Sequence, residues 1–171
     1  MKQEYFEELR RAMNVLSYHP KSIFVGQAVA CAGTAMSNTL TDVPVHKRLE
    51  FPVAENMQMG FCTGIAMAGW LPICIFPRIN FMLEAISQLV QHLDKIPLFS
   101  DYRPKVIIRT AIATPVPLDP GPQHLGDYTD AVEKMLSTVR VVRLADANEI
   151  VPAYRAAMEA DHSTLLVETY L

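Results

Sequence analysis

The sequence predicts an α/β domain of three layers, in which helices cover both faces of a mostly parallel central sheet. Short apolar runs and longer helical segments alternate along the 171 residues. The runs are continuously apolar and do not alternate with polar residues, which is typical of strands covered on both faces. The length suits one domain with a sizeable core.

The first half of the chain contains two expected helices and three expected strands. Residues 4–17 form an amphipathic helix, with Phe6, Leu9, Met13 and Leu16 on one side. A strand over 23–25 ends at Gly26, and a weaker one over 49–51 ends at Pro52. Residues 54–69 form an apolar helix that Gly69 closes. The apolar run 71–76 is the third strand.

The second half continues the alternation. A helix is expected over 79–93, where apolar residues recur at helical spacing. A strand over 106–108 precedes a proline-rich loop over 110–121. The remaining expected elements are a helix over 127–136, a strand over 139–142, a helix over 147–159 and a closing strand over 165–167.

Composition narrows the function classes. Half of the residues are hydrophobic and the net charge is −3, which indicates a globular protein, and the lack of a basic patch disfavours nucleic acid as a partner. Cys31, Cys62 and Cys74 are odd in number and widely spaced, which favours reduced thiols in the cytoplasm. No signal peptide and no apolar run of membrane-spanning length is present, so no membrane partner is expected.

Glu55 is the first candidate site residue. It stands at the start of the helix over 54–69, which carries no charge between Glu55 and Gly69 and is therefore expected to be buried. One interpretation is a carboxylate held by backbone donors and by the helix dipole, worth about 0.3–1 kcal/mol. The other is a buried acid with a raised pKa that shares a proton with a ligand nitrogen. Spacing alone favours the first.

The other candidates follow strand ends, where open parallel sheets bind ligands. Arg78 and Arg109 each could hold an anionic substrate group or pair with an acid. His124, in a glycine- and proline-containing turn over 121–127, either moves protons near neutral pH or caps the loop. Phe81 is either core filler or a surface for a ring to stack on. No histidine pair has the spacing of metal ligands, so no metal site is expected.

Several motifs are absent. The chain has no Gly-x-Gly-x-x-Gly, no Walker lysine loop and no Gly-x-Ser-x-Gly elbow. It therefore lacks the usual phosphate-binding loops and the nucleophile elbow of hydrolases. It also has no Gly-Asp-Gly segment with a following asparagine.

A series of short segments carries a family resemblance. They are Pro52-Val53-Ala54-Glu55 with the helix to Gly69, Pro72-Ile73, Asn80-Phe81, Ala85-Ile86-Ser87-Gln88, Arg109, Gly121-Pro122-Gln123-His124, Val141-Val142 and Leu165 to Glu168. In this order and near this spacing they resemble the pyrimidine-binding domain of thiamine diphosphate enzymes. The type is that of transketolases and of 2-oxo acid dehydrogenase β subunits, with pyruvate dehydrogenase-like enzymes the most similar. The resemblance covers nearly the whole chain.

The resemblance implies roles for single residues. Glu55 matches the glutamate that hydrogen-bonds the pyrimidine N1′ atom of the cofactor and so promotes loss of the thiazolium C2 proton. Phe81 matches an aromatic residue of the pyrimidine pocket, and His124 matches a loop histidine near the reacting centre. Gln27 and Met57 are further expected cofactor contacts. Expected substrate contacts are Arg78, Arg109 and Gln123.

The sequence departs from the family pattern at several points. Gln27 and Ala28 replace an acidic pair, and Arg78 replaces a small or apolar residue, which favours an anionic substrate. The family's β subunits continue beyond the position of Leu171 into another α/β domain.

The missing Gly-Asp-Gly…Asn segment is the family's magnesium and diphosphate site. The resemblance therefore implies that residues 1–171 are a single pyrimidine-binding domain. Its partner would be a diphosphate-binding α-type subunit that carries the Mg²⁺ ligands, in an α2β2 heterotetramer.

The reaction stays open at the level of sequence. A β-type subunit could take part in pyruvate dehydrogenase-like decarboxylation of a 2-oxo acid or in transketolase-like two-carbon transfer from a 2-oxo acid or ketose. A split 2-oxo acid decarboxylase is an alternative that the chain length favours. A non-catalytic assembly subunit is a further alternative, which the presence of Glu55 disfavours.

Overall fold

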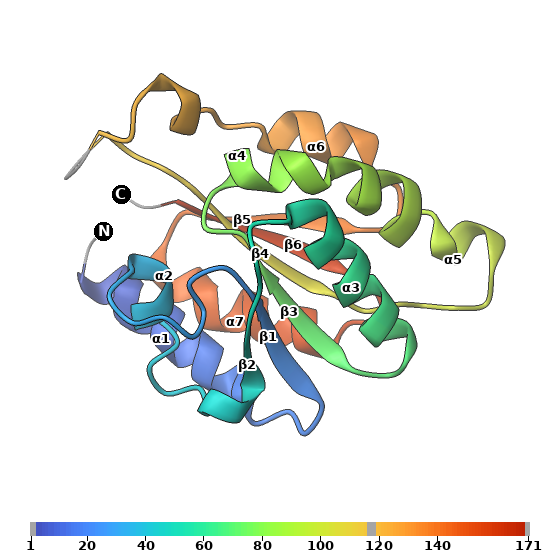
Figure 1. Cartoon of the computed structure of the whole chain (residues 1–171), viewed down its shortest axis with the longest axis horizontal. Helices are drawn as coiled ribbons and strands as arrows, with labels where there is room; N and C mark the ends of the chain where they lie inside the picture. Colours follow the sequence, from blue (N-terminus) through green and yellow to red (C-terminus); the bar gives the residue numbers. More distant parts are fainter. Residues whose placement is uncertain (1–2, 116–118, 170–171) are drawn as a thin grey trace.

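A computed structural model describes residues 3–115 and 119–169, which form three layers around one sheet (Figure 1). The six strands run in the order β2-β1-β3-β4-β6-β5, and every neighbouring pair is parallel. The strands are β1 (Ser22–Gly26), β2 (Arg48–Glu50), β3 (Leu71–Ile75), β4 (Ile107–Ile112), β5 (Arg140–Leu144) and β6 (Thr164–Thr169). The predicted fold class is confirmed.

Helices cover both faces of the sheet. On one face α1 (Gln3–Ser17) packs beside α7 (Ala147–Glu159), with the short α2 (Ala35–Asn38) next to α1. On the other face lie α3 (Glu55–Met67), the segment that begins with α4 (Ile79–Met82), and α6 (Thr129–Met135). None of the helices in the described ranges combines the length and apolarity needed to cross a membrane.

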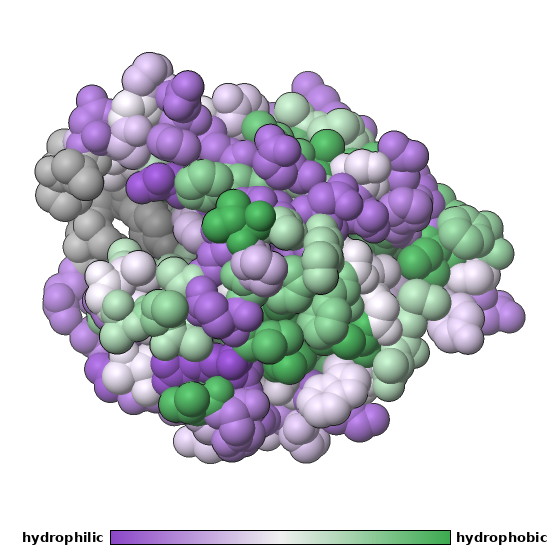
Figure 2. All heavy atoms as spheres, in the orientation of Figure 1, coloured by the Kyte–Doolittle hydropathy of each residue, from purple (hydrophilic) through white to green (hydrophobic). Residues whose placement is uncertain are grey.

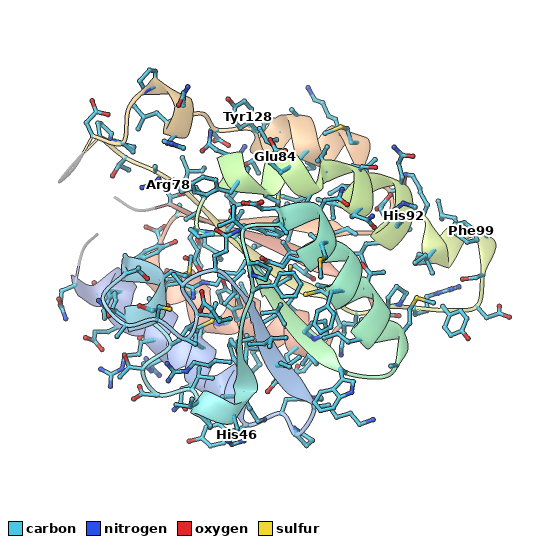
Figure 3. The ribbon with its side chains drawn as sticks, viewed as in Figure 1. His46, Arg78, Glu84, His92, Phe99 and Tyr128 are labelled. Atoms are coloured by element: carbon cyan, nitrogen blue, oxygen red, sulfur yellow. The ribbon has the colours of Figure 1, made fainter. Side chains whose placement is uncertain are left out.

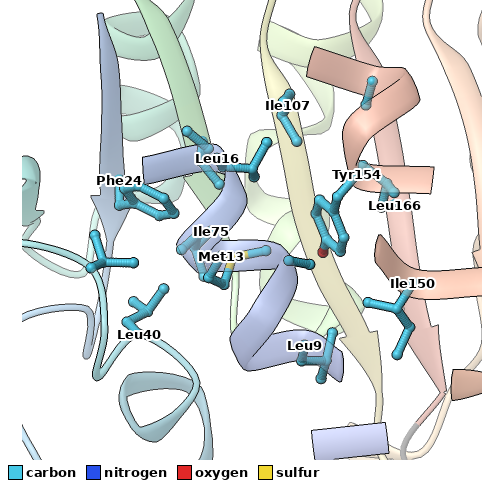
Figure 4. Packing of buried hydrophobic residues seen from close by; sticks show 14 of the residues in the cluster. Leu9, Met13, Leu16, Phe24, Leu40, Ile75, Ile107, Ile150, Tyr154 and Leu166 are labelled. Atoms are coloured by element: carbon cyan, nitrogen blue, oxygen red, sulfur yellow. The ribbon is translucent and has the colours of Figure 1, made fainter. Parts of the chain in front are cut away.

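The strands supply side chains to two separate apolar clusters. Phe24 and Ile107 face α1 and α7, where they meet Leu16 and Tyr154 (Figure 4). Their chain neighbours, Val25 and Ile108, belong to the cluster under α3 and α6. Since successive side chains of a strand point to opposite faces, consecutive apolar residues such as these fill the clusters on both sides of the sheet.

The helix predicted over 79–93 is wrong in its detail. The segment consists of α4, a 3₁₀ turn η2 (Leu83–Ala85) and a π-helical turn η3 (Gln88–Leu93), and a further helix, α5 (Ile96–Phe99), follows it. Its apolar side chains still face the sheet. The spacing of apolar residues identifies the buried side but does not encode whether an N–H bonds the fourth or the fifth residue back.

Asp94 joins the end of this segment to the loop before β5. Its side chain is fully buried and accepts hydrogen bonds from the backbone N–H groups of Ser137, Thr138 and Val139 at 2.7–3.0 Å. Lys95 Nζ lies 2.7 Å from Oδ2. Burial raises the pKa of Asp94, but the hydrogen bonds from Lys95 and the three N–H groups outweigh it and lower the pKa to about 2.

Asp94→Ala is expected to lower the free energy of unfolding at pH 7 by about 3 kcal/mol, because three buried N–H groups lose a charged acceptor. The pKa is lower in the folded than in the unfolded chain, so the wild type has this stabilisation above about pH 4 and loses it as the pH falls toward 2. The lost part is about 2 kcal/mol. Urea unfolding between pH 2 and pH 7 measures it.

Asp101→Ala, which removes an exposed aspartate a few residues later, is the matched control. It is expected to leave both the stability and its pH dependence as in the wild type. If the Asp94→Ala variant kept the wild-type pH dependence of stability, Asp94 would not be the group that causes this dependence.

Candidate functional site

Three of the predicted site residues follow the carboxyl ends of β1, β2 and β3. Gln27 directly follows β1, Glu55 begins α3 after β2, and Arg78 follows β3. The ends of β1 and β3 approach closely, since a Cβ atom on Gly26 would lie 2.4 Å from the carbonyl oxygen of Ile75. This is the edge of a parallel sheet at which ligands bind.

Glu55 is held at this edge by a side chain and not by backbone donors. Only 8% of the residue is exposed. Its Oε1 accepts a hydrogen bond from Gln27 Nε2 at 3.0 Å. Among the described residues no other donor reaches the carboxylate, so Oε2 is available to a ligand.

Gln58, which the sequence interpretation missed, fixes the first turn of α3. Its side chain is fully buried, and Nε2 donates to the backbone oxygen of Ile75 at 2.9 Å. The same nitrogen lies 3.4 Å from Cys74 Sγ and 3.5 Å from the backbone oxygen of Val25. Gln58 thereby ties the helix that carries Glu55 to the ends of β1 and β3. The signal was a polar residue three positions after Glu55 in an apolar helix.

Glu50 orders the loop that follows Gln27. Its carboxylate accepts the backbone N–H groups of Ala28, Val29 and Ala30 at 2.6, 2.9 and 2.7 Å. Three successive N–H groups form an anion-binding nest, which Glu50 fills, and Ala28 takes a positive φ of 56° there. The sequence held no signal for this contact, because its two sides are about twenty residues apart.

A second group of predicted residues gathers around Phe81. We call Arg78, Asn80, Phe81, Gln123 and His124 the Phe81 cluster. The ring centroids of Phe81 and His124 are 5.3 Å apart at 46°, and the Arg78 Cζ atom lies 5.9 Å from the Phe81 centroid. Asn80 Nδ2 donates to the backbone oxygen of Gln123 at 2.9 Å. Figure 3 places Arg78 at the start of α4. The hydrogen bond between Asn80 of α4 and Gln123 anchors the loop that carries His124 on that helix.

Two polar atoms of the Phe81 cluster lack partners. His124 Nδ1 and Asn80 Oδ1 are buried, and neither forms a hydrogen bond with a described residue. Most buried polar atoms in proteins have partners. The cluster therefore has unused capacity for hydrogen bonds with a ligand.

Arg109 does not belong to the site. It is fully buried on the face that α1 and α7 cover, and its Nε and Nη2 donate to Glu168 at 2.6 and 3.1 Å. Its Nη1 donates to Thr39 Oγ1 at 2.8 Å. Of the two predicted roles, the structure shows pairing with an acid. The structure does not show the predicted substrate contact, because Glu168 and Thr39 enclose the guanidinium.

Met57 lies on the outer side of α3 and is 62% exposed, so it joins neither group. The helix was expected to be buried, yet only its inner side is, through residues such as Met59 and Cys62. Phe61 and Met67 are also exposed on the outer side. Figure 2 shows hydrophobic residues gathered over α3. Apolar composition predicted burial, but this chain does not itself cover the outer side.

A cavity of about 270 Å³ among the described residues does not coincide with this site. Its lining includes Pro104, Thr138 and Ser163, which precede β4, β5 and β6. It therefore lies at the opposite, amino edge of the sheet. Within 3–115 and 119–169, no group of three or more His, Cys, Asp or Glu side chains is arranged to hold a metal ion.

Comparison with known families identifies the family of the chain. The sequence model of a family described as "Transketolase, pyrimidine binding domain" matches residues 2–170. The chain belongs to this family. Domains of the family bind thiamine diphosphate. The family predicted from the short segments between Pro52 and Glu168 is thus confirmed.

Solved transketolase structures share the fold. The chain matches one described as "Split gene transketolase, inactive beta4 tetramer" with a TM-score of 0.74 and 17% identity, covering 95% of this chain and 50% of that chain. It matches the transketolase of Campylobacter jejuni subsp. jejuni NCTC 11168 with a TM-score of 0.69 and 17% identity, covering 95% and 25% of the two chains. It matches the transketolase of Leishmania mexicana with a TM-score of 0.70 and 15% identity, covering 95% of this chain and 24% of that chain.

The chain therefore spans half or less of the length of these transketolase chains. At such low identities the likeness concerns the fold alone. No curated protein sequence showed significant similarity to the chain.

Proposed function

We propose that this chain is the pyrimidine-binding, β-type subunit of a heteromeric thiamine diphosphate-dependent enzyme that acts on a 2-oxo acid or a ketose. Glu55 is the observation that carries the proposal. In a domain of the pyrimidine-binding family, it offers a nearly buried carboxylate with one oxygen oriented by Gln27 and the other open.

The residues at the carboxyl edge fit the pyrimidine end of the cofactor. Glu55 Oε2 is an acceptor for a protonated ring nitrogen, and Gln27 holds the carboxylate in place. Phe81 offers an aromatic surface for stacking, whereas Met57 faces outward from α3 and could reach the cofactor only where a partner subunit covers that side. Thiamine diphosphate, when bound, supplies a nucleophilic carbon that attacks a substrate carbonyl.

The proposed mechanism gives each residue one task. Glu55 holds the proton that it shares with the pyrimidine nitrogen, and its low exposure strengthens this hydrogen bond by keeping water away. Gln58 keeps the helix start in position through Ile75. His124 binds the substrate or moves a proton through Nδ1, its buried and unbonded nitrogen. Gln123, in the same loop, is a further contact with the substrate.

A second subunit completes the proposed enzyme. A diphosphate-binding α-type subunit would supply the Mg²⁺ ligands, in an α2β2 assembly in the cytoplasm. The outer side of α3 supports a partner, because Val53, Met57, Phe61 and Met67 leave an apolar surface exposed there. The name of one solved relative, a split gene transketolase, supports a division of the enzyme between chains.

Cofactor titration of the chain, alone and with its partner, tests the proposal. The tagged chain is isolated from its native cells, the associated subunit is identified by mass spectrometry, and the two are reconstituted. Calorimetric titration with thiamine diphosphate and Mg²⁺ is expected to show binding by the complex and none by the isolated chain. Tight binding by the isolated chain would refute the division of the site between two subunits.

The same complex distinguishes the reaction classes. Release of CO₂ from 2-oxo acids without an acceptor indicates decarboxylation, as in a split decarboxylase or a dehydrogenase-like enzyme. A longer product formed only with an aldehyde indicates transketolase-like two-carbon transfer. A complex that binds the cofactor but turns over no donor would favour a non-catalytic assembly subunit.

A further inference from the structure

Arg78 differs from the other arginines of the described residues that are at least partly buried. Those others, Arg10, Arg48 and Arg109, each donate hydrogen bonds to an oxygen acceptor. Arg78 is also partly buried, yet no described residue accepts a hydrogen bond from it or lies within ion-pair distance. A partly buried guanidinium with no hydrogen-bond acceptor among the described residues has unused N–H donors, which makes Arg78 a candidate for binding an anion.

The position of Arg78 is fixed by the backbone and by an aromatic ring. It precedes the first residue of α4 with an extended backbone, at φ −146° and ψ 153°. Its guanidinium carbon lies 5.9 Å from the centroid of Phe81. A guanidinium held over a ring keeps its N–H groups free for a carboxylate or a phosphate.

The Phe81 cluster also contains unused hydrogen-bonding atoms. The His124 ring lies against Phe81 with the centroids 5.3 Å apart and the planes tilted at 46°, and its buried Nδ1 has no hydrogen bond with a described residue. The amide of Asn80 is oriented by its bond to Gln123, which leaves Oδ1 buried and without a donor. A cation, an imidazole nitrogen and an amide oxygen are thus available together.

We propose that Arg78 is a specificity-determining residue, which binds an anionic group of the substrate remote from the carbonyl that reacts. This inference rests on the proposed function and names the substrate class of the same site. A carboxylate, a sulfonate or a phosphate has the required chemistry, since each offers oxygens to the guanidinium fork. His124 and Asn80 bond polar atoms of the substrate next to that group.

Anion binding to the isolated chain tests Arg78 without any turnover. The ¹⁵N signal of Arg78 Nε is followed by NMR while succinate or inorganic phosphate replaces chloride at constant ionic strength. A saturable shift of this signal and of the His124 ring signals is expected. Arg78→Gln is expected to abolish the shift of the His124 ring signals.

Arg155→Gln, which changes an exposed arginine of α7 on the opposite face, is the matched control and is expected to keep the shifts. Absence of a saturable shift at Arg78, or an equal shift at Arg155 in the wild type, would overturn the proposal.

Matched donor pairs in the reconstituted complex identify the source of the anionic group. The pairs are 2-oxoglutarate with 2-oxopentanoate, and fructose 6-phosphate with fructose. The wild type is expected to prefer the member with the remote anionic group in one pair by at least tenfold in kcat/KM, and Arg78→Gln to reduce that preference at least tenfold, with Arg78→Lys in between.

Turnover of donors without preference in either pair, or a preference that Arg78→Gln leaves intact, would overturn the proposal. If the proposed function itself is wrong, the wild-type complex turns over no donor at all. The anion shift at Arg78 in the isolated chain still appears in that case, so the two failures are distinguishable.

Discussion

Glu55→Gln is expected to lower kcat of the assembled enzyme by about 100-fold or more, the usual range for loss of a group that holds a transferred proton. The amide has the size of the carboxylate and can keep a hydrogen bond with Gln27. It cannot share a proton with the pyrimidine nitrogen. Steady-state kinetics of the reconstituted complex, with thiamine diphosphate affinity measured by calorimetry, separates loss of turnover from loss of binding.

The same chemical change at Glu159 is the control for this prediction. Glu159 is the last residue of α7, exposed and on the opposite face of the sheet from α3. Glu159→Gln is expected to keep wild-type turnover. Thermal unfolding of the Glu55→Gln variant is expected to match the wild type within a few degrees, since the loss of one hydrogen bond's charge changes stability by about 1 kcal/mol. Full activity of Glu55→Gln would sink the proposed mechanism.

The layers of the fold could be predicted because they depend on periodicity and composition. Adjacent residues such as Phe24 and Val25 are both apolar and fill different clusters, so the run itself indicated a sheet covered on both faces. The position of Glu55 at the start of an uncharged helix indicated a special carboxylate. These signals lie within a few residues of sequence and need no knowledge of distant contacts.

Contacts between distant segments could not be predicted in the same way. Glu50, Gln58 and Asp94 bond backbone groups elsewhere in the chain, and a backbone N–H or C=O leaves no mark in the sequence. The alternation of side chains along β4 places Arg109 and Ile108 on different faces of the sheet. It does not identify Glu168, 59 residues later, as the acid that pairs with Arg109. The role of Arg109 therefore stayed open until strand order was known.

Glu168→Gln is expected to lower the free energy of unfolding by about 3–5 kcal/mol, because it removes the carboxylate charge that pairs with the buried Arg109 guanidinium. Both side chains of this pair are fully buried. Tyr154 also donates to Glu168, at 2.6 Å, so the variant weakens a network of at least three groups. Urea unfolding followed by circular dichroism measures the loss.

Arg143→Gln is the control for burial, since Arg143 pairs with Asp127 at 2.8 Å but is 41% exposed. Its expected cost is below about 1 kcal/mol. A Glu168→Gln variant whose stability fell no further than that of Arg143→Gln would contradict a structural role for the buried pair.

Removing both charges distinguishes a structural role of Arg109 from a role in substrate binding. Arg109→Met with Glu168→Gln removes both charges of the pair, so the double variant is expected to lose less stability than the two single variants together, by about 1–3 kcal/mol. Tyr154 and Thr39 keep polar groups that must find new partners, which limits the recovery. If Arg109 acts only in folding, the assembled double variant regains turnover along with stability. Recovery of stability without turnover would instead return Arg109 to the site.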